Sequence, residues 1–178
     1  MMTADEPEEK VLEFLDRMLQ RKPVRAFLDV VVTRVEQRLR TDPASVMAWE
    51  PIPLDVYGTP LPVAIQSSWV FILRADTATG DERHPNSRQR MMSYRGTGDL
   101  QTRTTTCWES HHLYSDFHLP LQQRWISIPV NVWHQAVTPA ANWVVVSFHT
   151  VPADELVEER PGPSDAGSTQ QRKYLEMT

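Results

Sequence analysis

The feature that most constrains the fold is a succession of short β-type segments between residues 46 and 151, with no helical period between them. These segments are rich in aromatic and β-branched side chains and are separated by turn-forming residues. They cover residues 46–49, 65–74, 89–95, 100–105, 125–128, 134–137 and 143–150. Because no helices intervene, the strands cannot build βαβ units, and we expect an antiparallel barrel or sandwich.

The segments on either side of these strands differ from them in character. Residues 1–45 contain two apolar stripes at helical spacing, divided at Pro23, and predict an N-terminal helical extension. We expect these helices to pack on the β domain or on a second subunit. Residues 46–160 form the predicted β domain. Residues 161–178, which begin with a stretch rich in Pro, Gly and Ser, are predicted to form a flexible C-terminal tail.

The overall composition excludes several classes of protein. The chain has 178 residues and a net charge of −5, and it lacks a basic stripe suited to nucleic acid. Its longest apolar run is too short to cross a bilayer, and residues 1–10 are acidic, unlike a signal peptide. The single cysteine, Cys107, excludes a disulfide within the chain. We therefore expect a cytoplasmic protein that binds neither nucleic acid nor membranes.

Chemistry-bearing residues are concentrated in residues 80–90. Glu82 and His84 are two positions apart, so on a strand both side chains point to the same face. The Pro-Asn-Ser sequence at 85–87 favours a chain reversal, after which Gln89 could return to that face. A second segment, residues 128–137, has turn formers at Pro129 and Asn131 before His134, which we expect to face inward. The two segments could thus converge on one point.

The spacing of these two segments resembles the two motifs of the cupin family. Positions of the first motif are held here by Glu82, His84, Gln89 and Gly96. Positions of the second motif are held by Pro129, Asn131, His134 and Thr138. The resemblance covers the central part of the chain and leaves out the helices and the tail. It implies an all-β fold, a cupin-type antiparallel jelly-roll barrel, here with N-terminal helices.

The resemblance also implies a divalent transition metal, with His84, His134, Glu82 and Gln89 at the ligand positions. Glu82 stands where the family has a His, and Gln89 stands where it has a Glu, which makes Gln89 the weaker ligand. Two imidazoles and a carboxylate suit iron, while zinc, manganese or nickel would also fit. Two alternatives remain open: Glu82 faces solvent while Gln89 or water completes the shell, or the site is metal-free and both histidines contact a ligand directly.

Other polar residues near these segments have competing interpretations. Arg90 and Arg95 are candidate ligand-binding residues beside Gln89, because a guanidinium facing the pocket would bind a carboxylate or phosphate. Strand alternation from Gln89 places Arg95, and not Arg90, on the pocket face. Three further histidines, His111, His112 and His118, are assigned to a surface loop that could act as a lid, and His149 to a structural role.

The favoured function is a metal-dependent cupin that binds a small molecule in the barrel, with an anion among the candidate ligands. A dioxygenase-like oxidoreductase activity is the preferred chemistry, because the His-His-carboxylate set suits iron. The alternatives are a non-catalytic sensor or small-ligand-binding module, and an assembly role for the helices. We expect a homodimer, since exposed strand edges need covering. The substrate and the metal are left open by the sequence.

Overall fold

The structure is a computed structural model that describes residues 7–58, 60–162 and 168–176. Two helices come first, α1 (Glu8–Leu19) and α2 (Lys22–Thr41). The strands that follow are β1 (Met47–Pro51), β2 (Ser67–Leu73), β3 (Gln89–Arg95), β4 (Thr97–Arg103), β5 (Trp108–Tyr114), β6 (Trp125–Ile128), β7 (His134–Val137), β8 (Trp143–His149), β9 (Val157–Pro161) and β10 (Thr169–Lys173). Short 3₁₀ turns lie at Leu54–Tyr57, Leu121–Gln123 and Tyr174–Glu176.

The strands form a five-stranded sheet in the order β1-β2-β8-β3-β6, a three-stranded sheet β5-β4-β7 and a β9-β10 hairpin. Every strand pairing among the described residues is antiparallel. The predicted all-β jelly roll with N-terminal helices is therefore confirmed. One detail differs: in the described part of the chain the strands form separate sheets, and no single sheet closes into a continuous barrel.

Alternation along the central strands gives the five-stranded sheet two buried faces. On β2, Trp69 and Phe71 pack against the three-stranded sheet, while Val70 and Ile72 pack against the helices. The same alternation on β8 sends Val145 inward, and its neighbours face the helices. Burial on both faces explains why every residue of β2 and β8 is buried and why apolar runs occupy residues 69–73 and 143–146.

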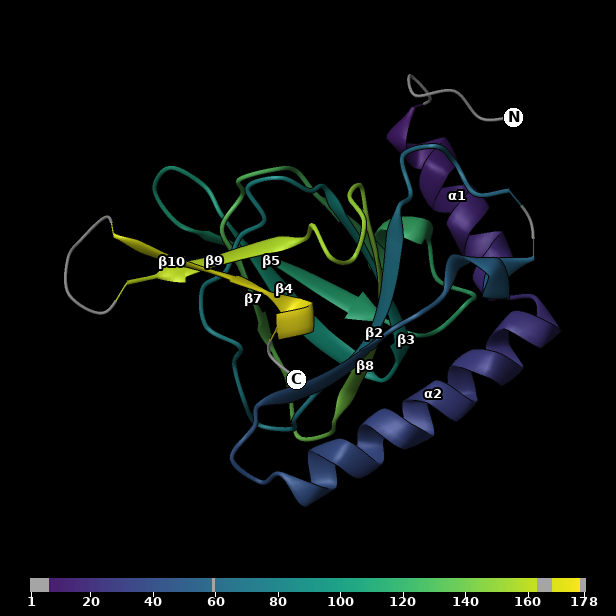
Figure 1. Cartoon of the computed structure of the whole chain (residues 1–178), viewed down its shortest axis with the longest axis horizontal. Helices are drawn as coiled ribbons and strands as arrows, with labels where there is room; N and C mark the ends of the chain where they lie inside the picture. The colour runs from purple at the N-terminus through teal and green to yellow at the C-terminus, as the bar shows by residue number, and fades with distance from the viewer. Residues whose placement is uncertain (1–6, 59, 163–167, 177–178) are drawn as a thin grey trace.

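The two helices cover the outer face of the five-stranded sheet, and α2 runs across β1 and β2 (Figure 1). Their apolar stripes, which include Leu15, Leu28 and Val32, are buried in that layer. The helices thus pack on their own domain, which removes the stripe as support for an assembly role. Within the described residues, neither helix has the length and apolar character needed to cross a membrane.

Three strands were not predicted from the sequence. Strand β5 contains His111 and His112, which the sequence analysis assigned to a loop, and it pairs along its whole length with β4. Strands β9 and β10 form a hairpin, so part of the segment predicted as a flexible tail is an ordered strand that ends at the buried Tyr174. Residues 163–167 and 177–178 of that segment lie outside the described residues.

Candidate metal centre

Glu82, His84 and His134 lie together inside the domain. One potential ligand atom from each residue lies within 4.8 Å of the others, and all three side chains are buried. The backbone fixes this arrangement: the Glu82 N–H donates to the His134 carbonyl at 2.9 Å, and the His134 N–H donates to the Glu82 carbonyl at 2.8 Å. The segment carrying Glu82 and His84 is thus held against β7, and the predicted convergence of these residues is observed.

Both histidine rings are oriented by backbone carbonyls. The Nδ1 of His84 lies 3.0 Å from the Val157 carbonyl oxygen, and the Nδ1 of His134 lies 3.0 Å from that of Val132. A carbonyl only accepts, so each Nδ1 carries the proton and each Nε2 presents a lone pair. Both Nε2 atoms are buried without a hydrogen-bond partner. This tautomer with a fixed ring is the arrangement that metal-binding histidines use.

The two carboxylate oxygens of Glu82 face different neighbours. Its Oε2 accepts a hydrogen bond from Arg160, while its Oε1 lies 3.5 Å from His134 Nε2, outside hydrogen-bond geometry. Burial alone would raise the pKa of Glu82, but a protonated His134 ring and the positive charge of Arg160 outweigh it and lower the pKa while no metal is bound. Glu82 is therefore an anion with one oxygen facing the imidazoles.

Burial sets the charge state of His84 as well. It lowers the pKa of His84 to about 4, and the neighbouring His134 contributes in the same direction. A neutral imidazole at neutral pH keeps its Nε2 lone pair available for a metal. The donor set therefore consists of one lone pair on each ring and one carboxylate oxygen.

Two of the positions that match the cupin motifs have a left-handed backbone. Gly96 has φ +84° and Asn131 has φ +65°. Asn is one of the few side chains that tolerates this region, so Asn131 serves where the cupin motif has glycine. Its N–H donates to the carbonyl of His84 at 3.0 Å, which ties the turn before His134 to the first motif.

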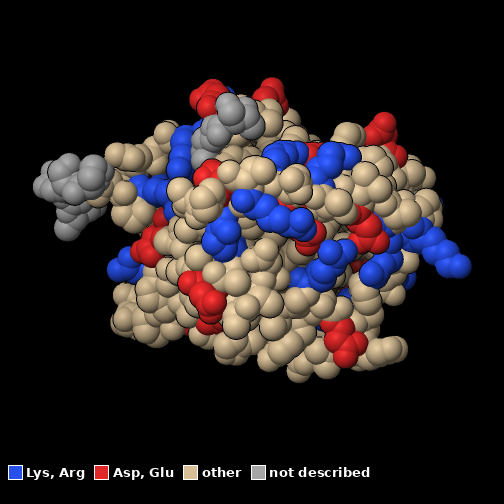
Figure 2. All heavy atoms as spheres, turned by 90° about the horizontal axis from the view of Figure 1, so that it is seen from below, with Lys and Arg blue, Asp and Glu red and all other residues tan. Residues whose placement is uncertain are grey.

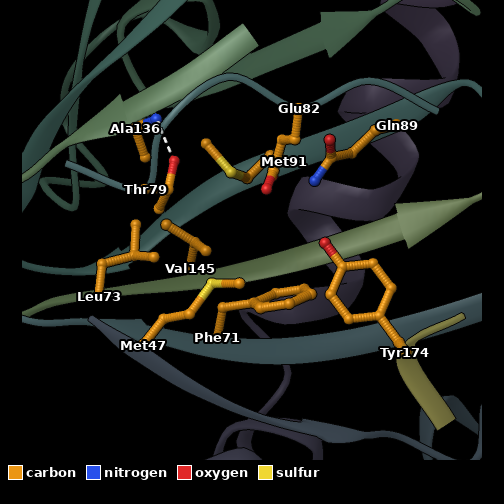
Figure 3. A pocket seen from close by; sticks show the side chains of 10 residues that line it. All are labelled: Met47, Phe71, Leu73, Thr79, Glu82, Gln89, Met91, Ala136, Val145 and Tyr174. Carbon is orange, nitrogen blue, oxygen red and sulfur yellow. Dashed lines mark hydrogen bonds between the residues drawn. The ribbon is translucent and has the colours of Figure 1, made fainter. Parts of the chain in front are cut away.

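A small cavity adjoins the centre, with a free volume of about 30 Å³. Its wall is mostly apolar, with polar side chains at Thr79, Glu82, Gln89 and Tyr174 (Figure 3). Gln89 donates from Nε2 to Ser147 Oγ at 3.2 Å, and its Oε1 is buried without a partner. Gln89 thus offers the cavity an acceptor, at the position where the cupin motif has a ligand.

Arg90 and Arg95 contact the helices and not the cavity, which corrects their predicted role in ligand binding. Arg90 is buried against α1 and makes two hydrogen bonds to the carboxylate of Glu8, at 2.7 and 2.9 Å. Arg95 pairs with Asp29 and Glu36 of α2. Regular strand alternation does not extend to Arg95, because a register shift in β3 between residues 93 and 95 changes the face on which Arg95 lies.

The four remaining histidines do not belong to the three-residue cluster, and among them only His149 lies next to it. His111 contacts Thr102 Oγ1 at 2.8 Å on β4, and His112 and His118 are exposed. His149 is fully buried, with its ring centroid 5.0 Å from that of His84, and both of its nitrogens contact serine hydroxyls, those of Ser87 and Ser147. Its hydrogen bonds agree with the predicted structural role.

Three residues on or just after the C-terminal hairpin were not predicted from the sequence. Arg160 contacts Glu82 and also Glu158, which is fully buried. Burial, with the nearby charge of Glu82, raises the pKa of Glu158 to about 7. Tyr174 lines the cavity. The Glu-Glu-Arg run at 158–160 was the one signal that could have indicated a buried ionic cluster, since the Pro, Gly and Ser that follow it resemble a linker.

On one face of the molecule, basic and acidic side chains are intermingled and form no continuous basic patch (Figure 2). This face lies on the α2 side of the view in Figure 1. Basic and acidic side chains also form ion pairs here: Arg34 and Arg38 of α2 both pair with Glu50 of β1.

Neither the models of known families nor the curated proteins match the chain, whereas solved structures do. Pumpkin seed globulin is 13% identical with a TM-score of 0.50, covering 66% of this chain and 28% of that one. An oxalate oxidase in complex with the substrate analogue glycolate is 10% identical with a TM-score of 0.47, covering 61% and 52%. An oxalate decarboxylase from Lactobacillus farciminis, in a formate complex, is 12% identical with a TM-score of 0.46, covering 61% and 30%.

The chain spans about half of the oxalate oxidase and less than a third of the other two proteins. At such low identities, these likenesses concern the fold alone. One fold supports many unrelated functions, so the activity must be argued from the site.

Proposed function

We propose that this chain, which has the cupin fold, holds a divalent transition metal with Glu82, His84 and His134 and presents it to a small molecule in the adjoining cavity. The preferred activity is a dioxygenase-like oxidation, because two imidazoles and one carboxylate with open positions suit non-haem iron. Zinc, manganese and nickel also fit this donor set.

The observation that carries the proposal is the pair of buried, unpartnered Nε2 atoms on His84 and His134. A buried polar atom without a partner costs free energy, typically about 1–3 kcal/mol. Two such atoms in a cluster whose potential ligand atoms lie within 4.8 Å of one another, with their rings fixed from behind, are well explained by a shared cation. A proton shared between His134 and Glu82 would satisfy only one of the two rings.

A bound metal would supply Lewis-acid or oxygen-activating chemistry to a ligand in the cavity. The chain's own residues have separate tasks. The carbonyls of Val132 and Val157 hold the imidazoles in the tautomer that leaves Nε2 free. Arg160 restrains Glu82, and apolar side chains such as Met91 and Val145 line the cavity. Gln89 is either a weak further ligand or a contact for the small molecule.

The ligand is proposed to be a small molecule that is anchored by the metal. An anionic ligand remains part of the proposal, but its charge would be balanced by the cation, because Arg90 and Arg95 contact the helices. A homodimer and a cytoplasmic location belong to the proposal as well. The cytoplasmic location is supported by the single cysteine, Cys107, which is exposed as a free thiol.

A non-catalytic sensor or binding module is the second candidate. Gln89 favours it, since an amide replaces a carboxylate at a cupin ligand position and weakens the hold on the metal. Oxygen uptake separates the two. If the iron-loaded chain consumes oxygen when a small molecule that it binds is added, the chain is an enzyme. If it binds the small molecule without oxygen uptake and without changing it, the chain is a sensor.

Elemental analysis tests the metal directly. Full-length protein from cells grown with added iron, zinc, manganese and nickel should contain close to one transition metal per chain. A His84→Ala, His134→Ala double variant should lose it, because two of three ligands are gone. His118→Ala is the matched control, since it removes an exposed histidine and should keep the metal.

A wild-type chain without metal under these conditions would overturn the proposal. Metal that persists in the folded double variant would do so too, because it would then be bound elsewhere. Far-UV circular dichroism on each variant establishes that the chains compared are folded.

A further inference from the structure

The end of the chain returns to the cavity through Tyr174, which is 2% exposed. Its ring lies among aromatic side chains, with centroids 5.6 Å from those of Trp49, Trp69 and Phe71. The centroid of the candidate ligand His84 lies 6.1 Å away. Tyr174 thus forms part of the wall of the proposed metal pocket.

The β9-β10 hairpin positions Tyr174. Strand β10 pairs with β9 and with no other strand among the described residues. Side chains reinforce the hairpin: Arg172 donates to the buried Glu158, and Gln171 donates to Glu159. The Tyr174 hydroxyl also interacts with Glu158. The ring therefore reaches the cavity from a segment outside the two large sheets.

The ring of Tyr174 limits the volume of the cavity. With Tyr174 in place the free volume is about 30 Å³, which is enough for only one or two water-sized groups. Figure 3 shows the Tyr174 hydroxyl directed toward Gln89, with Phe71 beside the ring and Met47 farther along the wall. Tyr174 is the largest side chain of the cavity wall that does not come from a strand, so its substitution would enlarge the cavity most without altering a sheet.

We propose that Tyr174 is a specificity-determining residue, which restricts the pocket to short ligands carrying one polar group on a small apolar body. The inference rests on the proposed function, because it presumes that a ligand approaches a metal held by Glu82, His84 and His134. The apolar wall suits the body of such a ligand, and the unpartnered Oε1 of Gln89 suits a hydrogen-bond donor on its polar group.

Straight-chain hydroxamic acids, from acetohydroxamic to octanohydroxamic acid, provide a test on the full chain loaded with cobalt(II). Their head group binds metals and carries donor hydrogens, and the tail measures the available length. The visible absorption of cobalt(II) changes on ligation, so a dissociation constant is obtained for each member without any activity measurement.

The wild type should prefer the shortest members, and its dissociation constant should rise with tail length. Tyr174→Ala should reverse this order, because each methylene that enters the freed apolar space strengthens binding by about fourfold. Tyr174→Phe should keep the wild-type order, because the ring remains.

Leu156→Ala is the matched control. Leu156 is fully buried in the same apolar cluster as Tyr174 but does not line the cavity, so the length preference should not change. Tyr174→Leu removes less volume and takes the place of Tyr174→Ala if circular dichroism shows that the alanine variant is unfolded.

The outcomes separate this inference from the proposal on which it rests. A wild type that does not bind cobalt(II) overturns the proposed function. A wild type that binds cobalt(II) and the hydroxamates, while folded Tyr174→Ala or Tyr174→Leu shows the same length preference, overturns the role of Tyr174 alone.

Discussion

The layers on the two faces of the five-stranded sheet differ in how their buried polar groups are satisfied. Beneath the helices these groups have hydrogen-bond partners, whereas on the other side several of them have none. On the helix face, Asp16 accepts hydrogen bonds from both Arg124 and Trp125. In the layer between the inner face and the three-stranded sheet, Gln89 of β3, His134 of β7 and the nearby His84 each keep a buried atom without a partner. Among the described residues, Arg90 Nη1 is the exception on the helix face.

This difference indicates where stability and function reside. Paired polar groups beneath the helices hold the domain together, whereas unpartnered groups between the two sheets reduce stability, as expected if they form the proposed metal site. Functional sites commonly carry such a cost. Substitutions on the two faces should therefore have unequal effects.

The largest effect is expected at Asp16 on the helix face. Asp16→Ala leaves the buried guanidinium of Arg124 without its anion, which should lower the free energy of unfolding by about 3–5 kcal/mol. Urea denaturation measures the change, and Glu13→Ala, an exposed residue of the same helix, is the control. A loss below about 1 kcal/mol would show that this pair does not stabilise the helix layer.

A smaller, pH-dependent effect is expected at Glu8. Partial burial raises its pKa, but hydrogen bonds from Arg90 and Ser127 and the charges of Arg90 and Arg88 lower it overall. A lowered pKa means that the ion pair stabilises the fold above the ordinary value of 4.5 and that this contribution disappears as the pH falls through the folded-state pKa.

Glu8→Gln should accordingly cost about 1 kcal/mol or less at pH 7, since solvent screens this half-exposed group. The difference from wild type should vanish at low pH. Urea denaturation across pH 3–7 measures it, with Glu9→Gln as the exposed control. A difference that grows on acidification would contradict the assigned direction.

The smallest effect is expected at Gln89 on the inner face. Gln89→Leu removes one long hydrogen bond to Ser147 but also removes a buried carbonyl oxygen without a partner. These terms nearly cancel, so the free energy of unfolding should change by less than about 1 kcal/mol. A loss above about 2 kcal/mol would show that Gln89 is part of the structural core and would weaken the contrast between the faces.

The clustering of Glu82, His84 and His134 could be predicted from the sequence, partly from local spacing and partly from the resemblance to the cupin motifs. Glu82 and His84 share a face by strand alternation, a Pro-Asn-Ser turn follows them, and the cupin spacing supplies His134. The antiparallel all-β architecture was predictable for a similar reason, since short β-type segments without intervening helices leave few other arrangements.

Features that depend on distant pairing could not be predicted. A register shift in β3 moved Arg95 to the helices, and nothing in the local sequence marks it. Strand β5, with its polar histidines, is an edge strand of the three-stranded sheet and lacks apolar alternation. Tyr174 follows a stretch whose composition resembles a linker, so its return to the cavity is a tertiary effect.

Anomalous X-ray scattering at the absorption edge of the bound metal shows whether Glu82, His84 and His134 hold it. A crystal of the metal-loaded protein should give one strong peak about 2.0–2.2 Å from the Nε2 atoms of His84 and His134 and from one oxygen of Glu82. No peak at that point, with the two rings bridged instead by water or by a ligand, would contradict the account.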